Sequence, residues 1–226
     1  METHFQGELN RLKMQLLTMA GLVEKAISNA VKALVTRDTN LAEKTIADDD
    51  KVNQLELQID EECLRLLALH QPMAADLRFI TSAMRINVEL ERIGDLAVNI
   101  AERAVSLNQE PQLKPYLDIP EMAELTQKML KDVLDAFVNR NPDLARSVCE
   151  RDQRVDALNN QIFRELLTYM MAEPSSIARA VHLLIVSRYL ERIADHTTNI
   201  AEGVIFMVNA LVIKHHADAA SGSNGG

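Results

Sequence analysis

The chain has 226 residues, of which 47% are hydrophobic and 25% are charged, a composition typical of a folded globular protein. Seven glycines, six prolines and 4% aromatic residues are too few for a many-stranded β protein, and no run of eighteen apolar residues is present to span a membrane. The formal net charge of −9 argues against nucleic acid as a partner and against direct contact with an anionic membrane through a basic patch.

In chain order, the apolar periodicity predicts three helices, a proline-rich linker and three further helices. The expected helices cover 5–37, 41–69, 73–108, 121–140, 142–172 and 175–213. Pro72 and Pro174 mark a turn in each half, and Asn141 with Pro142 form a helix start, as N-cap and first helical residue. The last residues, 217–226, are small and polar, and we expect them to be disordered.

The two halves of the chain repeat each other. At an offset of 103 residues, 16 of 46 positions are identical between 19–64 and 122–167, where roughly three would match by chance. At an offset of 100, nine of 14 positions match between 89–102 and 189–202. The offset therefore changes by three residues between 65 and 89, and a length change of this kind belongs in a turn.

Apolar residues recur along 73–108 in alternating steps of three and four, which is the pattern of a helix-bundle seam. They are Phe79, Ala83, Ile86, Leu90, Ile93, Ala97, Ile100, Ala104 and Leu107. The same pattern follows 175–213, with Thr197 as the polar exception. The sequence predicts an all-α protein of two tandem three-helix bundles, 1–110 and 121–216, joined by a linker at 111–120 and followed by the tail.

Acidic and amide side chains form a second row on the third helix of each half. In the first half they are Glu91, Asp95, Asn99 and Glu102, and in the second Glu191, Asp195, Asn199 and Glu202. Steps of four, four and three place each set on one face of its helix, away from the apolar seam.

The second helix of each half carries a matching pair, Asp49 with Asn53 and Asp152 with Asp156. Because these pairs and the acidic rows are about equally far from the intervening turn, they should face one another in an antiparallel hairpin. Gly94 and Ala194 are small residues that leave room between the helices.

Several carboxylates within a few ångströms of one another favour a bound cation, because they cannot all remain ionised without one. Oxygen ligands on rigid helices suit Mg²⁺, Mn²⁺, Ca²⁺ or iron, and zinc is a further candidate metal. The alternative is a solvated acidic face next to Arg92 and Arg192.

The segments Glu89-Leu-Glu-Arg-Ile-Gly-Asp95 and Leu190-Glu-Arg-Ile-Ala-Asp195, with Asp49–Asn53 and Asp152–Asp156, resemble the PhoU family of bacterial phosphate-transport accessory and regulatory proteins. The resemblance extends from about residue 5 to 213. It implies two three-helix bundles and metal ions bound by the acidic motifs. Asn53 departs from the acidic pattern and offers only a carbonyl oxygen.

The resemblance further implies a cytoplasmic negative regulator of the phosphate-starvation response that modulates phosphate uptake. Its implied partners are the ATPase subunit of the phosphate ABC transporter and a sensor histidine kinase, which would bring it to the membrane. A non-enzymatic regulator is the leading hypothesis. A metal-dependent phosphoester hydrolase and a metal-free helical adaptor are the alternatives.

Other residues point less clearly to a function. Cys63 and Cys149 stand where the other half has aliphatic residues, so we expect both in the core. His196 follows Asp195 and is a minor candidate for metal contact. A flanking apolar row, Leu77, Ile80 and Met84, favours self-association as a homodimer.

Overall fold

The computed structural model describes residues 4–210, and all its regular structure is helical. The helices are α1 (His4–Thr36), α2 (Thr39–Ala47), α3 (Asp50–His70), α4 (Ala74–Asn108), α5 (Asp118–Asn139), α6 (Pro142–Ala172) and α7 (Ile177–Asn209), with a 3₁₀ turn, η1, at Pro174–Ser176. Counting α2 and α3 as two parts of one rod, each half has three rods. The prediction of two tandem three-helix bundles is confirmed.

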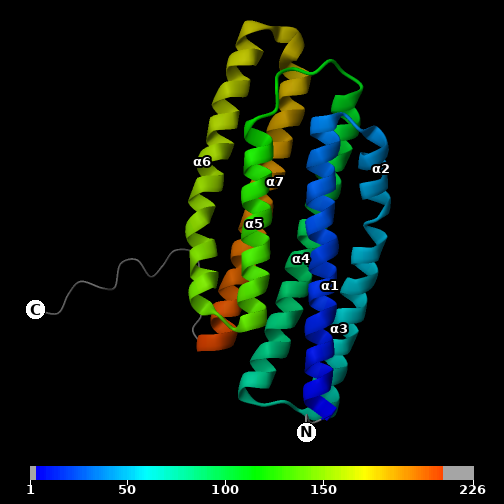
Figure 1. Ribbon diagram of the computed structural model, residues 1–226, viewed down its shortest axis with the longest axis vertical. Coiled ribbons are helices and arrows are strands. Elements are labelled where there is room, and N and C mark those ends of the chain that lie inside the picture. Colours follow the sequence, from blue (N-terminus) through cyan, green and yellow to red (C-terminus); the bar gives the residue numbers. More distant parts are fainter. Residues whose placement is uncertain (1–3, 211–226) are drawn as a thin grey trace, which may run out of the picture.

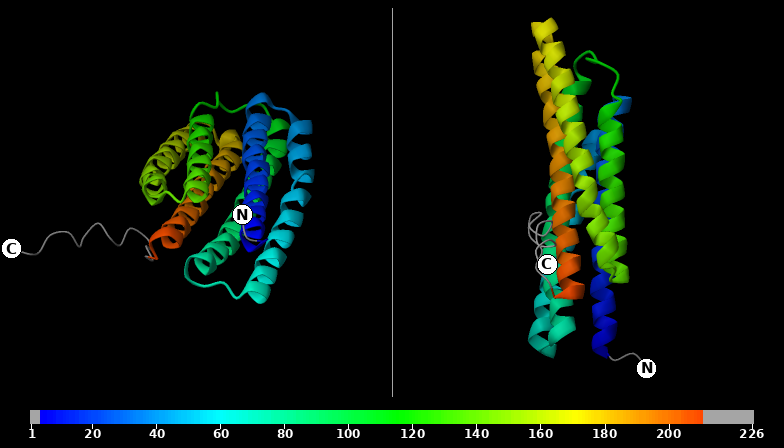
Figure 2. Two further views of the ribbon diagram at one scale, coloured as in Figure 1. Left: turned by 60° about the horizontal axis from the view of Figure 1, so that its bottom comes forward. Right: turned by 90° about the vertical axis from the view of Figure 1, so that its left-hand side faces the viewer.

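The two bundles lie side by side and run in opposite directions (Figures 1 and 2). In Figure 1 the turn between α3 and α4 is at the bottom of the molecule, whereas the turn between α6 and α7 is at the top. The bundles join along two antiparallel helix pairs, α4 with α7 and α1 with α5. The outer rods, α2–α3 and α6, therefore flank a central layer made by both halves.

Polar contacts hold α4 and α7 in antiparallel register at four levels. They are Arg78 Nε to Met207 O at 3.2 Å, Ser82 Oγ to Gly203 O at 3.4 Å, Glu89 Oε2 to His196 Nδ1 at 2.7 Å and Arg103 Nη1 to His182 Nδ1 at 3.4 Å. Because the contacts extend over most of both helices, the interface fixes how the two halves sit relative to one another.

The predicted seams form the core. Every apolar residue of the α4 seam is buried, and so are those of the α7 seam up to Met207. Thr197 is buried too, and its hydroxyl donates to the carbonyl oxygen of Ile193 at 2.8 Å. Such a bond within the helix allows a polar residue to occupy the seam.

The prediction of one helix over 41–69 is wrong, because the structure has two. The first begins at Thr39, and the rod breaks between Ala47 and Asp50. Three aspartates in succession, Asp48 to Asp50, stand at the break, and aspartate disfavours helix interiors because its side chain competes for backbone donors. The second half has Arg151-Asp152-Gln153 at the equivalent positions, and α6 is continuous there.

Two other expected boundaries also differ. The helix placed at 121–140 begins at Asp118, inside the expected linker, because proline is tolerated in a first helical turn. The last helix ends at Asn209, where Ala210 adopts a left-handed conformation. The expected extension to 213 and the tail at 217–226 lie outside the described residues.

Other expectations on single residues have mixed outcomes. Asn141 caps α6 as predicted, accepting from the amides of Asp143 and Leu144 at 3.1 Å. The apolar row offered for self-association is not an open surface, because Ile80 is fully buried and only Leu77 is exposed. Within residues 4–210, no helix combines the length and the apolar character that crossing a membrane requires.

Candidate functional site

The predicted acidic residues of the first half meet across the α3–α4 hairpin. Asp49 lies at the N-terminal end of α3, and its carboxylate accepts from the Asn53 amide at 3.0 Å. Glu91 and Asp95 lie opposite on α4, close enough for the charges of Asp95 and Asp49 to act on Glu91. The hairpin therefore brings these four predicted residues together.

Gly94 allows the two helices to approach at this point. A Cβ atom added there would lie 3.3 Å from Val52 Cγ1 and 3.5 Å from Asp49 Oδ1. The close fit between α3 and α4 holds Asp49 beside the acidic row. This agrees with the expectation that a small residue makes room at the site.

Burial and mutual repulsion both disfavour the charged forms of these acids. Burial raises the pKa of Asp49, and the charges of Asp95 and Asp50 raise it further, against the hydrogen bond from Asn53. Burial also raises the pKa of Glu91, and the carboxylates of Asp95, Glu56 and Asp49 add to the effect. A cation at this point would relieve both costs.

The second half repeats the arrangement between α6 and α7. Burial raises the pKa of Asp195, as does the charge of Asp156. Burial raises the pKa of Glu191 as well, with contributions from Asp195 and Asp156. The Arg188 guanidinium forms an ion pair with Glu191 and opposes the shift.

Arginine therefore distinguishes the two sites. At the position of Arg188 the first half has Val88, so no arginine is paired with Glu91 from that turn of α4. Arg92 of the first half is paired with Glu89 instead, at 3.3 Å, and opposes the shift of the Glu91 pKa only through its charge. The first-half site is the more purely acidic of the two, although Asn53 replaces a carboxylate there.

The further candidates differ in surroundings. Asp152 and Glu202 both lie close enough to Cys149 to raise the pKa of its thiol, which burial raises first, to about 11. Asn199 donates to Glu89 at 3.0 Å across the two halves and so faces the interface. Asn99 is half-buried and Glu102 is exposed on the outer part of α4.

His196 does not face the acidic row beside it. Its Nδ1 lies 2.7 Å from Glu89 Oε2, so the ring is directed toward α4. Burial alone would raise the pKa of Glu89, but the hydrogen bonds from His196 and Asn199 outweigh it, and the pKa is lowered. His196 and Glu89 join the halves, and the charge of His196 also acts on Asp195 of the second-half site.

Sequence reasoning missed two members of the sites, Glu56 and Asn159. Glu56 acts on Glu91 in the first half, and Asn159, its equivalent, is hydrogen-bonded to Glu191 in the second. Each follows the matching pair on its helix by three residues, at Asn53 and Asp156. Extending the pairs by one more helical turn would have found both.

The donor chemistry fits a hard cation, since each site offers carboxylate and amide oxygens. The side-chain positions are looser than a closed coordination sphere. Among residues 4–210, no three His, Cys, Asp or Glu side chains gather closely enough to hold a metal ion. The carboxylates are within electrostatic reach of one another but not within ligand distance of a common point.

Fold and site together define a class: a duplicated all-helical protein with one cluster of carboxylates on the outer hairpin of each half. Comparison with known proteins agrees. The PhoU domain model matches residues 16–104 and again 119–204. Each match corresponds to one of the two halves.

The relatives match over almost their whole length. The phosphate-specific transport system accessory protein PhoU homolog of Pseudomonas aeruginosa is 43% identical over 212 residues, covering 93% of this chain and 88% of the relative. The Aquifex aeolicus homolog of the same name is 45% identical over 208 residues, 92% of this chain and 94% of the relative.

Solved structures show the same fold. The crystal structure of PhoU from Pseudomonas aeruginosa superposes with a TM-score of 0.89 at 44% identity, covering 92% of this chain and all (100%) of that one. The phosphate transport system regulatory protein PhoU from Streptococcus pneumoniae gives 0.86 at 30% identity, covering 94% and 100%. The chain belongs to the PhoU family, as the sequence motifs indicated.

The relatives carry the names of accessory and regulatory proteins. The expectation of a non-enzymatic protein is confirmed at the level of the family, whose names do not support the hydrolase alternative.

Proposed function

We propose that the chain is a cytoplasmic negative regulator of the phosphate-starvation response and a modulator of phosphate uptake. The observation that carries the proposal is the PhoU match in both halves, together with relatives named as accessory proteins of the phosphate-specific transport system. The proposed partners are the ATPase subunit of the phosphate ABC transporter and a sensor histidine kinase. These contacts bring the chain to the membrane.

We further propose that each half binds divalent or iron-type metal ions. Asp49, Asn53, Glu91 and Asp95 would hold them in the first half, and Asp152, Asp156, Glu191 and Asp195 in the second. The raised pKa values of Asp49, Glu91, Glu191 and Asp195 support this, because a cation stabilises the charged form of each. Binding draws together carboxylates that lie apart in this structure, and homodimer formation belongs to the same proposal.

Deletion of the gene tests the regulatory role. Phosphate-responsive genes should become active in phosphate-rich medium, and a plasmid copy of the wild-type chain should silence them again. Unchanged expression after deletion would contradict the role. Copies carrying Glu91→Gln with Asp95→Asn, or Glu61→Gln as the matched exposed control on α3, then separate metal binding from regulation.

Metal binding has its own test. Elemental analysis of the chain purified without chelator should find metal in the wild type and in Glu61→Gln, and less in the Glu91→Gln, Asp95→Asn variant. A wild-type chain without metal, also after dialysis against Mn²⁺ and Mg²⁺, would reject the metal proposal. The regulatory proposal would then stand on the family alone.

A further inference from the structure

A small cavity lies where the first helices of the two halves meet α4. Its volume is about 50 Å³, and it is lined by Gln6, Leu9, Asn10, Lys13, Phe79, Phe137, Val138 and Arg140. A water molecule needs about 10–15 Å³ of such space, so the cavity has room for an ion of several non-hydrogen atoms. α1, α4 and α5 all contribute, so an occupant would contact both halves.

Among the described residues that line this cavity, the two charged ones are both positive: Lys13 is half-buried and Arg140 is exposed at its edge. Lys13 and Arg140 face it, and none of the eight lining residues is acidic. The Lys13 ammonium donates one hydrogen bond, to the carbonyl oxygen of Val138 at 2.8 Å. Burial lowers the pKa of Lys13 and the neighbouring charge of Arg140 lowers it further. Two cations held near one another favour an anion between them.

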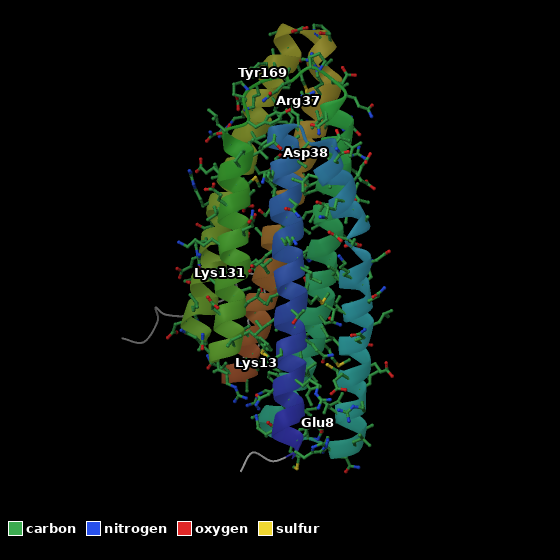
Figure 3. The ribbon with its side chains drawn as sticks, turned by 45° about the vertical axis from the view of Figure 1, so that its right-hand side comes forward. Glu8, Lys13, Arg37, Asp38, Lys131 and Tyr169 are labelled. Carbon is green, nitrogen blue, oxygen red and sulfur yellow. The ribbon has the colours of Figure 1, made fainter. Side chains whose placement is uncertain are left out.

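The duplication shows what satisfies the equivalent arginine in the first half. Arg37 is the equivalent of Arg140 at the offset of 103, and both follow the first helix of their half in a left-handed conformation, with φ of 56° and 51°. The two positions lie toward opposite ends of the molecule; Figure 3 labels Arg37 at one end of α1 and Lys13 toward the other.

Arg37 donates to carbonyl oxygens at and just after the end of α4. Its Nη2 donates to the carbonyl oxygens of Asn108 at 2.8 Å and Glu110 at 2.6 Å. Arg179, whose charge acts on Tyr116 as that of Arg37 does, donates to the carbonyl oxygen of Pro111 at 3.1 Å. No linker reaches the other end, where Arg140 borders the cavity. An oxygen-bearing ligand there would take the place that the carbonyl oxygens of Asn108 and Glu110 take at Arg37.

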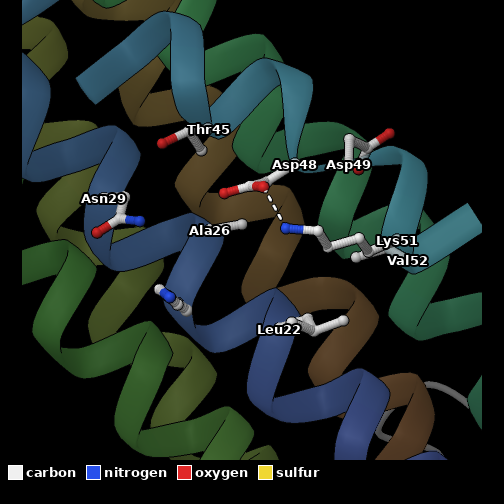
Figure 4. A pocket seen from close by; sticks show the side chains of 9 residues that line it. Leu22, Ala26, Asn29, Thr45, Asp48, Asp49, Lys51 and Val52 are labelled. Carbon is white, nitrogen blue, oxygen red and sulfur yellow. Dashed lines mark hydrogen bonds and ion pairs between the residues drawn. The ribbon is translucent and has the colours of Figure 1, made fainter. Parts of the chain in front are cut away.

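A second cavity of the same volume shows that two cations alone do not suffice. It lies beside the break between α2 and α3 and is lined by Lys25 and Lys51, but also by Asp48 and Asp49 (Figure 4). Lys51 forms an ion pair with Asp48 there. The positive charge in that cavity is already compensated, whereas no acidic side chain among residues 4–210 lines the cavity at Lys13.

We propose that the cavity bounded by Lys13 and Arg140 binds a tetrahedral oxyanion of the size of phosphate. Arginine presents several N–H donors in a planar fork that matches such oxygens, and lysine adds a point charge. The stacked rings of Phe79 and Phe137, with centroids 5.6 Å apart, form the apolar floor. The ligand would join α5 of the second half to α1 of the first.

Calorimetric titration with inorganic phosphate tests the site, using full-length chain stripped of metal on a chelating resin so that no metal ion carries the phosphate. The wild type should bind phosphate, and Arg140→Gln and Lys13→Gln should each weaken binding by about tenfold or more. Arg140→Lys should retain part of it. Glutamine is compatible with the left-handed position, since Gln71 adopts φ of 45° at the end of α3.

Arg37→Gln is the matched control, because it removes the equivalent arginine at the other end. It should leave phosphate binding unchanged while lowering thermal stability. Backbone amide shifts at residues 138–141 on adding phosphate would support the location. No binding by the wild type up to about 10 mM phosphate, or equal binding by wild type and Arg140→Gln, would overturn the proposal.

O-phosphoserine as a second titrant separates the two sources of a phosphate group. Binding of inorganic phosphate alone identifies the free ion, and binding of both identifies a site that also accepts phosphorylated partners. The proposal does not depend on the regulatory role. Loss of phosphate binding without derepression in the host would leave that role intact.

Discussion

At Glu91, burial and three neighbouring carboxylates raise the pKa of the side chain. A raised carboxyl pKa means that the folded state binds protons more readily than the unfolded state. Protonation of Glu91 therefore stabilises the folded state at low pH, and this stabilisation is lost as pH rises through the folded-state pKa. In a chain without metal, the charge of Glu91 opposes folding at neutral pH.

Glu91→Gln should therefore stabilise the metal-free chain at pH 7. Because the group is partly exposed, the gain should be only a few tenths to about 1 kcal/mol in urea unfolding. The gain should shrink toward about pH 4, where the wild-type carboxyl also becomes neutral. Glu61→Gln on α3 should show no such gain.

Added Mn²⁺ should reverse the order of stability. The wild type should gain stability with metal concentration, because a ligand that binds only the folded state stabilises it. Glu91→Gln should gain less. Equal gains in the two proteins would show that Glu91 is not a ligand.

Glu89 shows the opposite behaviour, because His196 and Asn199 hold its pKa below the usual value. Glu89→Ala leaves both donors without this acceptor and should cost about 1–3 kcal/mol at pH 7. The contribution is present above the unfolded pKa and lost as pH falls through the folded one, so wild type and variant should converge in acid. A constant difference in urea unfolding down to about pH 3 would contradict this account.

At the scale of elements, the two outer rods differ at one pair of positions. Arg151 of α6 forms an ion pair with Asp132 of α5 at 2.6 Å, and α6 is continuous. The equivalents in the first half are Asp48 and Asn29, and the rod breaks at Asp48. Asn29 carries no charge, so the pair equivalent to Arg151 with Asp132 is missing there, and Asp48 is acted on by Lys25 of α1 instead.

Introducing the second-half pair should mend the break. In the double variant Asp48→Arg, Asn29→Asp, the amides of Asp49 and Asp50 should exchange with deuterium more slowly than in the wild type, by about tenfold. Stability should rise by about 1 kcal/mol. The single variant Asp48→Arg should gain less, because Asn29 offers no charge. Unchanged exchange in the double variant would place the cause of the break elsewhere.

The difference between these rods shows which parts of the fold could be predicted from the sequence. Strong periodicity and internal duplication determine the helices and the seams, so both were predictable. The break at Asp48 was not, because the duplication suggested the continuous helix that α6 has. A run of three aspartates changes local backbone preference without disturbing the apolar pattern.

The sites also have features that the sequence predicted and features that it could not predict. Equal distance from the turn predicted that Asp49 and Glu91 would lie near one another across the hairpin, and the two side chains are within electrostatic reach. The interface partner of His196 could not be predicted, because Glu89 lies in the other half and reaches it only through the packing of α4 on α7. The spacing also does not show whether the carboxylates lie within ligand distance of a common point, and among residues 4–210 they do not.

At the scale of the whole molecule, the duplication also relates the contacts between the halves. At the offset of 100, Ser82 is equivalent to His182 and Arg103 to Gly203. The contact Ser82–Gly203 therefore becomes the contact Arg103–His182 when the two halves are interchanged. The two halves therefore pack with approximate twofold symmetry. That symmetry places one carboxylate cluster on each flank of the central α4–α7 pair.

An interface of this extent should hold the halves together without the linker. Inserting a specific protease site between Pro111 and Gln112 leaves the Arg37 bond to Glu110 and the ion pair of Lys114 with Glu165 in place. After cleavage, the two pieces should still elute as one particle at about 10 μM. A short intact linker corresponds to an effective concentration of about millimolar, so only a weak interface would depend on it.

Separation of the cleaved pieces on size exclusion would show that the linker, not the packing of α4 on α7 and α1 on α5, keeps the halves together. Glu89→Ala in the same cleavable background refines the test. It removes one contact of the interface and should shift the pieces measurably toward separation, whereas Glu61→Gln on the outer rod should not. If neither substitution affects association, the apolar seam alone carries the interface, and the polar contacts only set its register.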